Sequence, residues 1–95
     1  MPSHYTWDEA KRAKNLAKHG LDFEHVDLVL KSPYRLDVEV VRSGEARVQS
    51  LAYVFDALAV LTVVYVAGST TRIISFRKAS REEREVYHEW LAEES

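Results

Sequence analysis

The chain has 95 residues, of which 46% are hydrophobic and 29% charged, a composition typical of a small globular protein with one core. Its formal net charge of -2 at pH 7 excludes a generally basic nucleic-acid-binding protein, and the lack of cysteine excludes disulfides and thiolate ligands. No apolar run of signal-peptide length opens the sequence. We therefore expect one domain over residues 1–95, located in the cytoplasm and making no contact with a membrane.

The N-terminal part predicts a helix with a basic surface. Thr6 and Glu9 have the spacing of a capping box at its start, and residues 4–7 could form a short strand before it. Lys14 and Lys18 belong to its charged surface. Its apolar positions recur as a narrow stripe that we expect to face the core: Ala10, Ala13, Leu16 and Ala17.

The middle of the chain predicts a second helix followed by three strands. Asp22 is a suitable N-cap for a helix that reaches about Lys31, where a Ser-Pro pair stops it. Residues 34–41 alternate between apolar and polar side chains, which is typical of a strand with one wet face near a sheet edge. Residues 47–54 predict a second strand. Residues 58–67 are apolar at nearly every position and predict a central strand that is covered on both faces.

The C-terminal part predicts a strand that runs directly into the last helix. Residues 70–76 are rich in β-branched side chains, and Ser80 with Glu83 has the spacing of a capping box. The helix carries an apolar stripe that we expect in the core: Val86, Tyr87, Trp90 and Leu91. The predicted fold is an α+β domain with two N-terminal helices, a four-stranded antiparallel sheet and a C-terminal helix.

A cluster of cations spans the junction between this strand and this helix. Five cations fall within thirteen residues: Arg72, Arg77, Lys78, Arg81 and Arg84. Cations are disfavoured at a helix start, which is the positive end of the helix dipole, whereas free backbone N–H groups beside cations suit an anionic ligand such as phosphate. The alternative is a solvated charged face, with Arg81 paired to Glu85 at helical spacing.

The remaining residues restrict the chemistry that such a cluster could perform. The four histidines are scattered, and no glycine-rich phosphate loop is present, so we expect neither a metal nor a cofactor. RNA cleavage needs neither, because the 2′-hydroxyl attacks its own phosphodiester while the protein aligns it, moves protons and stabilises charge. Arg77 would grip the phosphate, Lys78 or His19 would move a proton, and Tyr87 would orient one.

Each of these assignments has a structural alternative. His19, beside Gly20, could simply interact with the dipole at the end of its helix, and Tyr87 is a core candidate first. Strand alternation places Arg72 and Arg77 on opposite faces unless a bulge intervenes, and the polar side with Ser75 and Arg77 is the better functional face. The predicted catalytic residues are Arg77, Lys78, Arg72, His19 and Tyr87. The predicted RNA-binding residues are Lys14, Lys18, Ser75, Arg81 and Arg84.

Two sets of residues, one near each end of the chain, together resemble the BrnT toxin family. The first set is Trp7-Asp8-Glu9, Lys11, Asn15, Lys18-His19-Gly20 and Phe23, and the second is Arg72-Ile73-Ile74-Ser75, Arg77-Lys78-Ala79, Glu83-Arg84 and Tyr87. The resemblance implies a RelE-like fold and a metal-independent ribonuclease toxin of a type II toxin–antitoxin pair. It also implies a BrnA-like ribbon-helix-helix antitoxin through which the complex binds its operator DNA.

Two further questions stay open at the level of the sequence. The chain could instead be a non-catalytic corepressor subunit that docks an antitoxin and supports operator binding. The apolar run at residues 58–67 leaves two alternatives for the sheet: three short helices could cover both faces unaided, or they could leave part of one face uncovered. Either the antitoxin or a second copy could cover it, which leaves a homodimer and a heterotetramer with antitoxin as alternatives.

Overall fold

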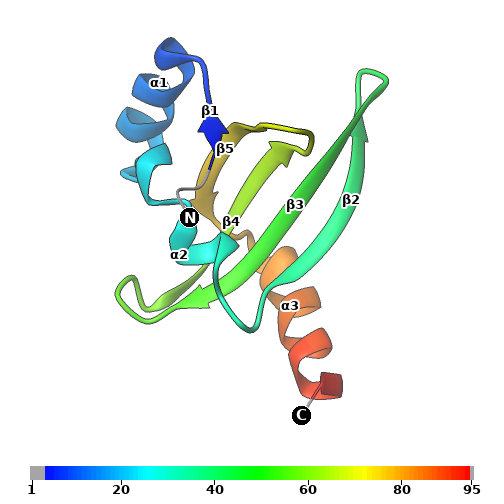
Figure 1. Ribbon diagram of the computed structural model, residues 1–95. Helices are drawn as coiled ribbons and strands as arrows, with labels where there is room; N and C mark the ends of the chain where they lie inside the picture. Colours follow the sequence, from blue (N-terminus) through cyan, green and yellow to red (C-terminus); the bar gives the residue numbers. More distant parts are fainter. Residues whose placement is uncertain (1–3, 95) are drawn as a thin grey trace.

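The computed structural model describes residues 4–94 and shows an α+β fold built on a mixed five-stranded sheet (Figure 1). The elements follow one another as β1 (Tyr5–Thr6), α1 (Glu9–His19), the 3-10 helix η1 (Phe23–His25), α2 (Asp27–Leu30), β2 (Leu36–Arg42), β3 (Glu45–Val54), β4 (Ala59–Val66), β5 (Thr71–Lys78) and α3 (Arg81–Glu94).

The sheet has the order β1-β5-β4-β3-β2. Strands β2 to β5 form the predicted antiparallel meander, with β2 at one edge and β4 in the centre. The prediction of four antiparallel strands is wrong in one detail, because the two-residue strand β1 pairs in parallel with Thr71 and Arg72 of β5. A strand of two residues is too short to show an alternating pattern, so the sequence could only suggest it.

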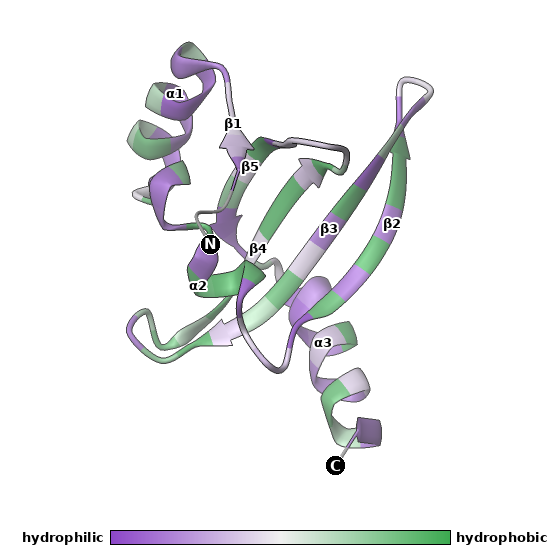
Figure 2. Cartoon of the chain, viewed as in Figure 1, coloured by the Kyte–Doolittle hydropathy of each residue, from purple (hydrophilic) through white to green (hydrophobic). Residues whose placement is uncertain are grey.

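Two apolar layers hold the helices against opposite faces of the sheet. On one face, called here the α2 face, Phe23, Val26 and Val29 pack over β4 and β5. On the other, the α3 face, Tyr87 packs with Leu51, and Trp90 and Leu91 adjoin them. The centre of the sheet is correspondingly apolar in Figure 2. The double burial predicted for residues 58–67 is therefore confirmed only for the middle of β4, where Leu61 and Val63 enter one layer and Val60 enters the other. Residues 64–66 are half-buried and Leu58 is exposed.

The second predicted helix is broken into two short pieces. Asp22 is the N-cap, as predicted, and accepts a hydrogen bond from the Glu24 N–H. The next turns are η1 and the four-residue α2 rather than one continuous α-helix. Phe23, Val26 and Val29 are all fully buried at a spacing of three, which favours the three-residue turn of a 3-10 helix.

Helix α1 packs with the opposite side from the one predicted. Its N-cap is Asp8, whose Oδ1 accepts from the N–H groups of the next turn, so the predicted capping box of Thr6 and Glu9 is wrong. The predicted buried stripe is wrong as well, because Ala10, Ala13, Leu16 and Ala17 are all exposed. The buried residue of α1 is Asn15.

Asn15 explains why this polar side faces inward. Its amide nitrogen donates to the carbonyl oxygens of Phe76 at 2.7 Å and Leu21 at 3.0 Å, and its oxygen accepts from the Phe76 N–H at 3.2 Å. Phe76 lies on the edge of β5 beyond the reach of β1, where backbone groups need partners from outside the sheet. One side chain thus satisfies a sheet edge and fixes α1 against it.

Helix α3 begins and packs largely as predicted. The Ser80 Oγ accepts from the Glu83 N–H at 3.2 Å, and Glu83 Oε1 accepts from the Ser80 N–H at 2.7 Å, which confirms the capping box. Val86 is an exception to the predicted apolar stripe, since it is exposed while Tyr87 is buried.

Replacing Asn15 by Ala should destabilise the protein by about 3 kcal/mol, because the buried N–H and C=O of Phe76 lose their partners. Urea unfolding followed by circular dichroism measures this, with Lys14→Ala on the exposed side of α1 as a control expected to change stability by less than about 0.5 kcal/mol. Equal stability of the two variants would contradict the role of Asn15 as the link between α1 and β5.

Candidate active site

A bulge in β5 brings the arginines of this strand to one face of the sheet. Tyr65 pairs with Ile73 and Val64 pairs with Ser75, so Ile74 is an extra residue in the ladder. Arg72 consequently lies opposite Val66 and Arg77 opposite Thr62. Because residues directly opposite in a ladder point to the same face, both arginines share the α3 face with Ser75. The expectation of opposite faces, which assumed no bulge, is corrected.

Arg77 is held by a carboxylate at the start of α3. Its Nη1 and Nη2 lie 2.8 and 3.0 Å from the two carboxylate oxygens of Glu83, which makes a bidentate ion pair. Gln49 of β3 donates to the same carboxylate at 2.6 Å and to the Thr62 hydroxyl at 3.1 Å. The hydrogen bond from Arg77, together with those from Ser80 and Gln49, lowers the pKa of Glu83 from 4.5 to about 2 despite partial burial.

This ion pair leaves part of the Arg77 guanidinium for a ligand. A guanidinium has five N–H donors. In Arg77, Nη1 donates to Glu83 and to the Lys78 carbonyl oxygen, and Nη2 donates to Glu83. Its Nε makes no hydrogen bond within residues 4–94. Because the side chain is 30% exposed, the Nε edge could bind a phosphate oxygen while Glu83 keeps the group in place.

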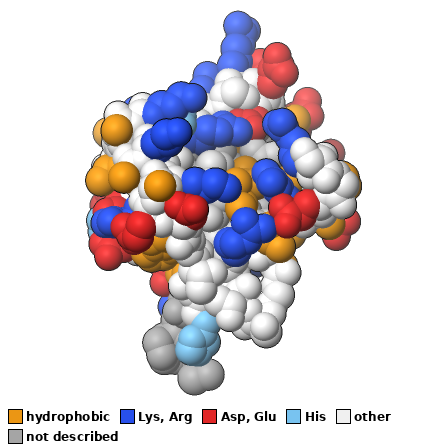
Figure 3. All heavy atoms as spheres, turned by 90° about the horizontal axis from the view of Figure 1, so that it is seen from above, with side chains coloured by type: hydrophobic (Ala, Val, Ile, Leu, Met, Phe, Trp, Pro, Cys, Tyr) orange, Lys and Arg blue, Asp and Glu red, His pale blue; other side chains and the backbone are white. Residues whose placement is uncertain are grey.

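A second group of arginines surrounds a carboxylate on the same face. Arg72 donates to Glu45 at 2.9 Å, and Arg47 donates to the other oxygen of Glu45 at 3.1 Å. Figure 3 looks onto the end of the molecule where α1 begins and shows many Lys and Arg side chains gathered there, with acidic side chains among them. The cations of this region are thus partly balanced by Glu45 and Glu83.

The lysines of α1 line a shallow hollow at the neighbouring edge of β5. The hollow has a volume of about 200 Å³ and is bounded by Lys11, Lys14, Lys18, His19, Asn15 and the bulge residue Ile74. Burial lowers the pKa of His19 below 6.5, and the positive charges of Lys18 and Arg77 lower it further. His19 is therefore mostly neutral at pH 7 and can accept a proton. The hydrogen bonds of Asn15 to Phe76 place α1 beside β5, so the two ends of the chain converge at this edge.

Several predicted site residues lie elsewhere or are used structurally. Tyr87 is only 1% exposed, and its hydroxyl donates to the Tyr34 carbonyl at 2.8 Å and accepts from the Tyr53 N–H at 3.3 Å. Its predicted role in orienting a proton is corrected to a structural one. Lys78 is exposed and pairs with Leu61 in the ladder. Its side chain therefore points to the α2 face, whereas Arg77 points to the α3 face.

The two predicted RNA-binding arginines of α3 also have local partners. Arg81 is almost fully exposed and pairs with Glu85 at 3.4 Å, as the solvated-face alternative required. Arg84 donates to the Ala79 carbonyl at 3.2 Å. Neither interaction brings these side chains to Arg77.

Sequence reasoning missed the polar residues of β3. The side chains of Gln49, Arg47 and Glu45 lie on the same sheet face as the arginines of β5. The role of Glu83 as the partner of Arg77 was missed as well, although the residue was recognised as a helix cap. The mixed polarity of residues 47–54 was the available signal. Deciding which of these side chains face the arginines of β5, however, requires the register of three strands. Among residues 4–94, no three His, Asp or Glu side chains gather in a way that could hold a metal ion.

Comparison with known families identifies the family of the chain. A family model described as the ribonuclease toxin BrnT of type II toxin–antitoxin systems matches residues 7–83, which include α1, β5 and both members of the Arg77–Glu83 pair. The chain belongs to the BrnT toxin family. No curated protein matches the chain. In the part of the chain that the structure describes, no helix is long and apolar enough to cross a membrane.

The Arg77–Glu83 pair should make the free energy of unfolding depend on pH in the acidic range. Because the folded-state pKa of Glu83 is depressed from 4.5 to about 2, its ionised form stabilises the fold above about pH 4.5, and this contribution is lost as the pH falls towards 2. Glu83→Gln should lower the free energy of unfolding by about 2 kcal/mol at neutral pH and by much less near pH 2. Urea unfolding across this pH range measures both values, with the exposed Glu82→Gln as control. A pH-independent difference would contradict the ion pair.

Proposed function

We propose that this chain is a metal-independent endoribonuclease, the toxin of a type II toxin–antitoxin pair, with a RelE-like fold. The observation that carries the proposal is a guanidinium, Arg77, held in place by Glu83 with its Nε edge open, on the strand beside which α1 places His19. A fixed cation and a nearby neutral base are the two elements that cleavage by an RNA 2′-hydroxyl requires.

The reaction follows from these two groups. The 2′-hydroxyl loses its proton to His19, and its oxygen bonds to the adjacent phosphorus as the bond to the 5′-oxygen breaks. Arg77 stabilises the negative charge that develops on the phosphate oxygens. The 5′-oxygen takes a proton from solvent as it leaves, because Lys78, the donor expected from the sequence, lies on the other face of the sheet from Arg77. The products are a 2′,3′-cyclic phosphate and a 5′-hydroxyl end.

The remaining cations are proposed to hold the RNA backbone. Lys14 and Lys18 border the hollow at the edge of β5, next to His19, and Arg72 and Ser75 share the face of Arg77. A strand of RNA that crosses this edge would meet the lysines on one side and the arginines on the other. We further propose that the chain acts in the cytoplasm and is neutralised by a BrnA-like ribbon-helix-helix antitoxin, through which the complex binds operator DNA and controls its own synthesis.

The purified chain, freed of antitoxin, should cleave RNA in the presence of EDTA, whereas Arg77→Ala and His19→Gln should each lower the rate by roughly 100-fold. The control is Lys31→Ala, which removes an exposed cation that is paired with Asp27 and does not line the hollow beside His19, and it should leave the rate unchanged. RNA with a 2′-deoxy residue at the cleavage point should resist. Cleavage of that substrate, or full activity of both site variants with a folded spectrum, would contradict the mechanism.

A non-catalytic corepressor remains the second candidate because of one observation. Arg77, Arg72 and Arg47 are each already paired with a carboxylate, which leaves fewer unpaired cations for a reacting phosphate. A corepressor would bind RNA or DNA without turnover, and its affinity would fall steeply with salt as counterions are released. Intact RNA at stoichiometric protein would favour this function over the nuclease.

A further inference from the structure

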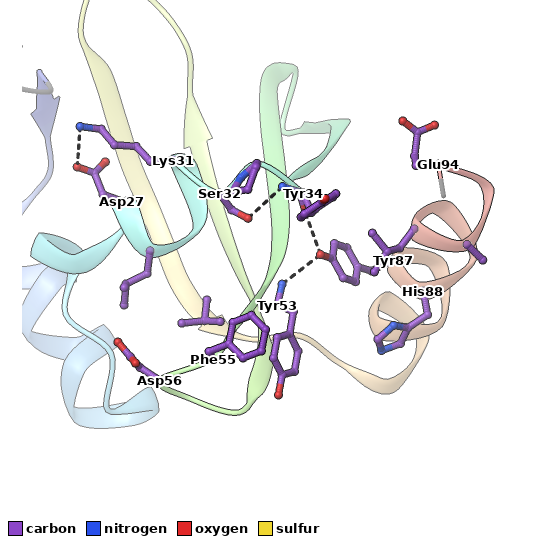
Figure 4. A pocket seen from close by; sticks show the side chains of 15 residues that line it. Asp27, Lys31, Ser32, Tyr34, Tyr53, Phe55, Asp56, Tyr87, His88 and Glu94 are labelled. Atoms are coloured by element: carbon purple, nitrogen blue, oxygen red, sulfur yellow. Dashed lines mark hydrogen bonds and ion pairs between the residues drawn. The ribbon is translucent and has the colours of Figure 1, made fainter.

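A large groove lies away from the arginine and lysine side chains. It has a volume of about 960 Å³ and is enclosed by α2, the loop that precedes β2, the turn between β3 and β4, and the C-terminal half of α3 (Figure 4). In Figure 1 these elements lie towards the end of the molecule opposite the start of α1. The groove is therefore separate from the candidate active site.

The lining of the groove exposes large apolar side chains. Phe55 is 81% exposed, Tyr34 is 61% exposed and Leu28 is 44% exposed. Leu58, at the same turn as Phe55, is 77% exposed. An apolar surface of this kind on a chain of 95 residues usually marks an interface.

The groove is formed before any partner binds. The Tyr87 hydroxyl from α3 bonds to the Tyr34 carbonyl and to the Tyr53 N–H, which joins the three walls (Figure 4). Phe55 packs edge-on against Tyr53 with ring centroids 5.1 Å apart. A partner would thus meet a fixed apolar surface and would not need to order it.

The charge around the groove is negative. Lys31 is paired with Asp27 at 3.5 Å, whereas Asp56 and Glu94 at the rim make no ion pair within residues 4–94. The last turn of α3 contains no basic residue to offset the negative end of its dipole. A segment that enters the groove should therefore carry lysine or arginine beside its apolar side chains.

The backbone around the groove favours a helix over a strand as its occupant. Strand β3 pairs with β2 only as far as Leu51, and beyond that point the outward Tyr53 N–H already donates to the Tyr87 hydroxyl, so an added strand would find no free donor beside the turn. A second copy of this chain is disfavoured, because a two-fold contact through the groove would bring its acidic rim against itself.

We propose that this groove receives an amphipathic helix of the antitoxin, which inserts an apolar stripe over Phe55, Leu28 and Tyr34 and places basic residues near Asp56 and Glu94. The inference rests on the proposed toxin–antitoxin function. It places the bound antitoxin helix on a surface separate from the one proposed to bind RNA.

Calorimetric titration of the whole chain with the purified antitoxin encoded beside it tests this docking. Phe55→Glu and Leu28→Glu should each weaken binding by about 100-fold, because they place a charge in an apolar contact. Val41→Glu on the edge strand β2 is the matched control, since Val41 is 72% exposed and lies outside the groove. It should change affinity by less than about threefold. Replacing Asp56 and Glu94 together by Lys should also weaken binding, most strongly at low salt.

The proposal would be overturned if Phe55→Glu bound the antitoxin as tightly as the unmodified chain does. It would also be overturned if the unmodified chain did not bind the antitoxin. A free chain that sediments as a dimer and is made monomeric by Phe55→Glu would also overturn it, with a second copy as the occupant. RNA cleavage by the free groove variants separates this result from the proposed function. If the parent and both variants leave RNA intact while the binding pattern holds, the nuclease fails and the docking surface stands.

Discussion

The carboxylate of Glu83 is the interaction on which the candidate active site depends. It closes the capping box that starts α3, binds both terminal nitrogens of Arg77 and accepts a hydrogen bond from Gln49 of β3. One side chain therefore joins a helix start and two strands. Its low pKa follows from these donors, so it stays ionised at the pH at which RNA would be cleaved. Without it, the guanidinium would be free to turn into solvent.

The regular elements could largely be predicted from local patterns, whereas the contacts at the edge of β5 could not. The capping box at Ser80, the N-cap at Asp22 and the double burial of the middle of β4 follow from spacing and polarity, and these are confirmed. The side of α1 that faces inward was mispredicted, because Asn15 is buried to satisfy a backbone edge that no helical pattern reveals. The bulge at Ile74 likewise has no local signature, yet it decides that Arg72 and Arg77 share a face.

The molecule is electrostatically two-sided, which fits the two proposed ligands. Cations at the edge of β5 and on the neighbouring face suit the phosphates of RNA, and the acidic rim of the groove suits a basic protein segment. Helix α3 links the two regions, since its first turn holds Arg77 and its last turns form a wall of the groove. The small net charge of -2 thus conceals two local surfaces of opposite sign.

The central claim is that Glu83 fixes Arg77 where a scissile phosphate would lie. Single-turnover cleavage of a defined RNA by Glu83→Gln tests it most directly, because glutamine keeps the shape and one hydrogen bond but removes the charge that grips both nitrogens of Arg77. The rate of the chemical step should fall by roughly tenfold or more at a pH where the variant is fully folded, with little change in RNA affinity. A parental rate in the folded variant would contradict the claim.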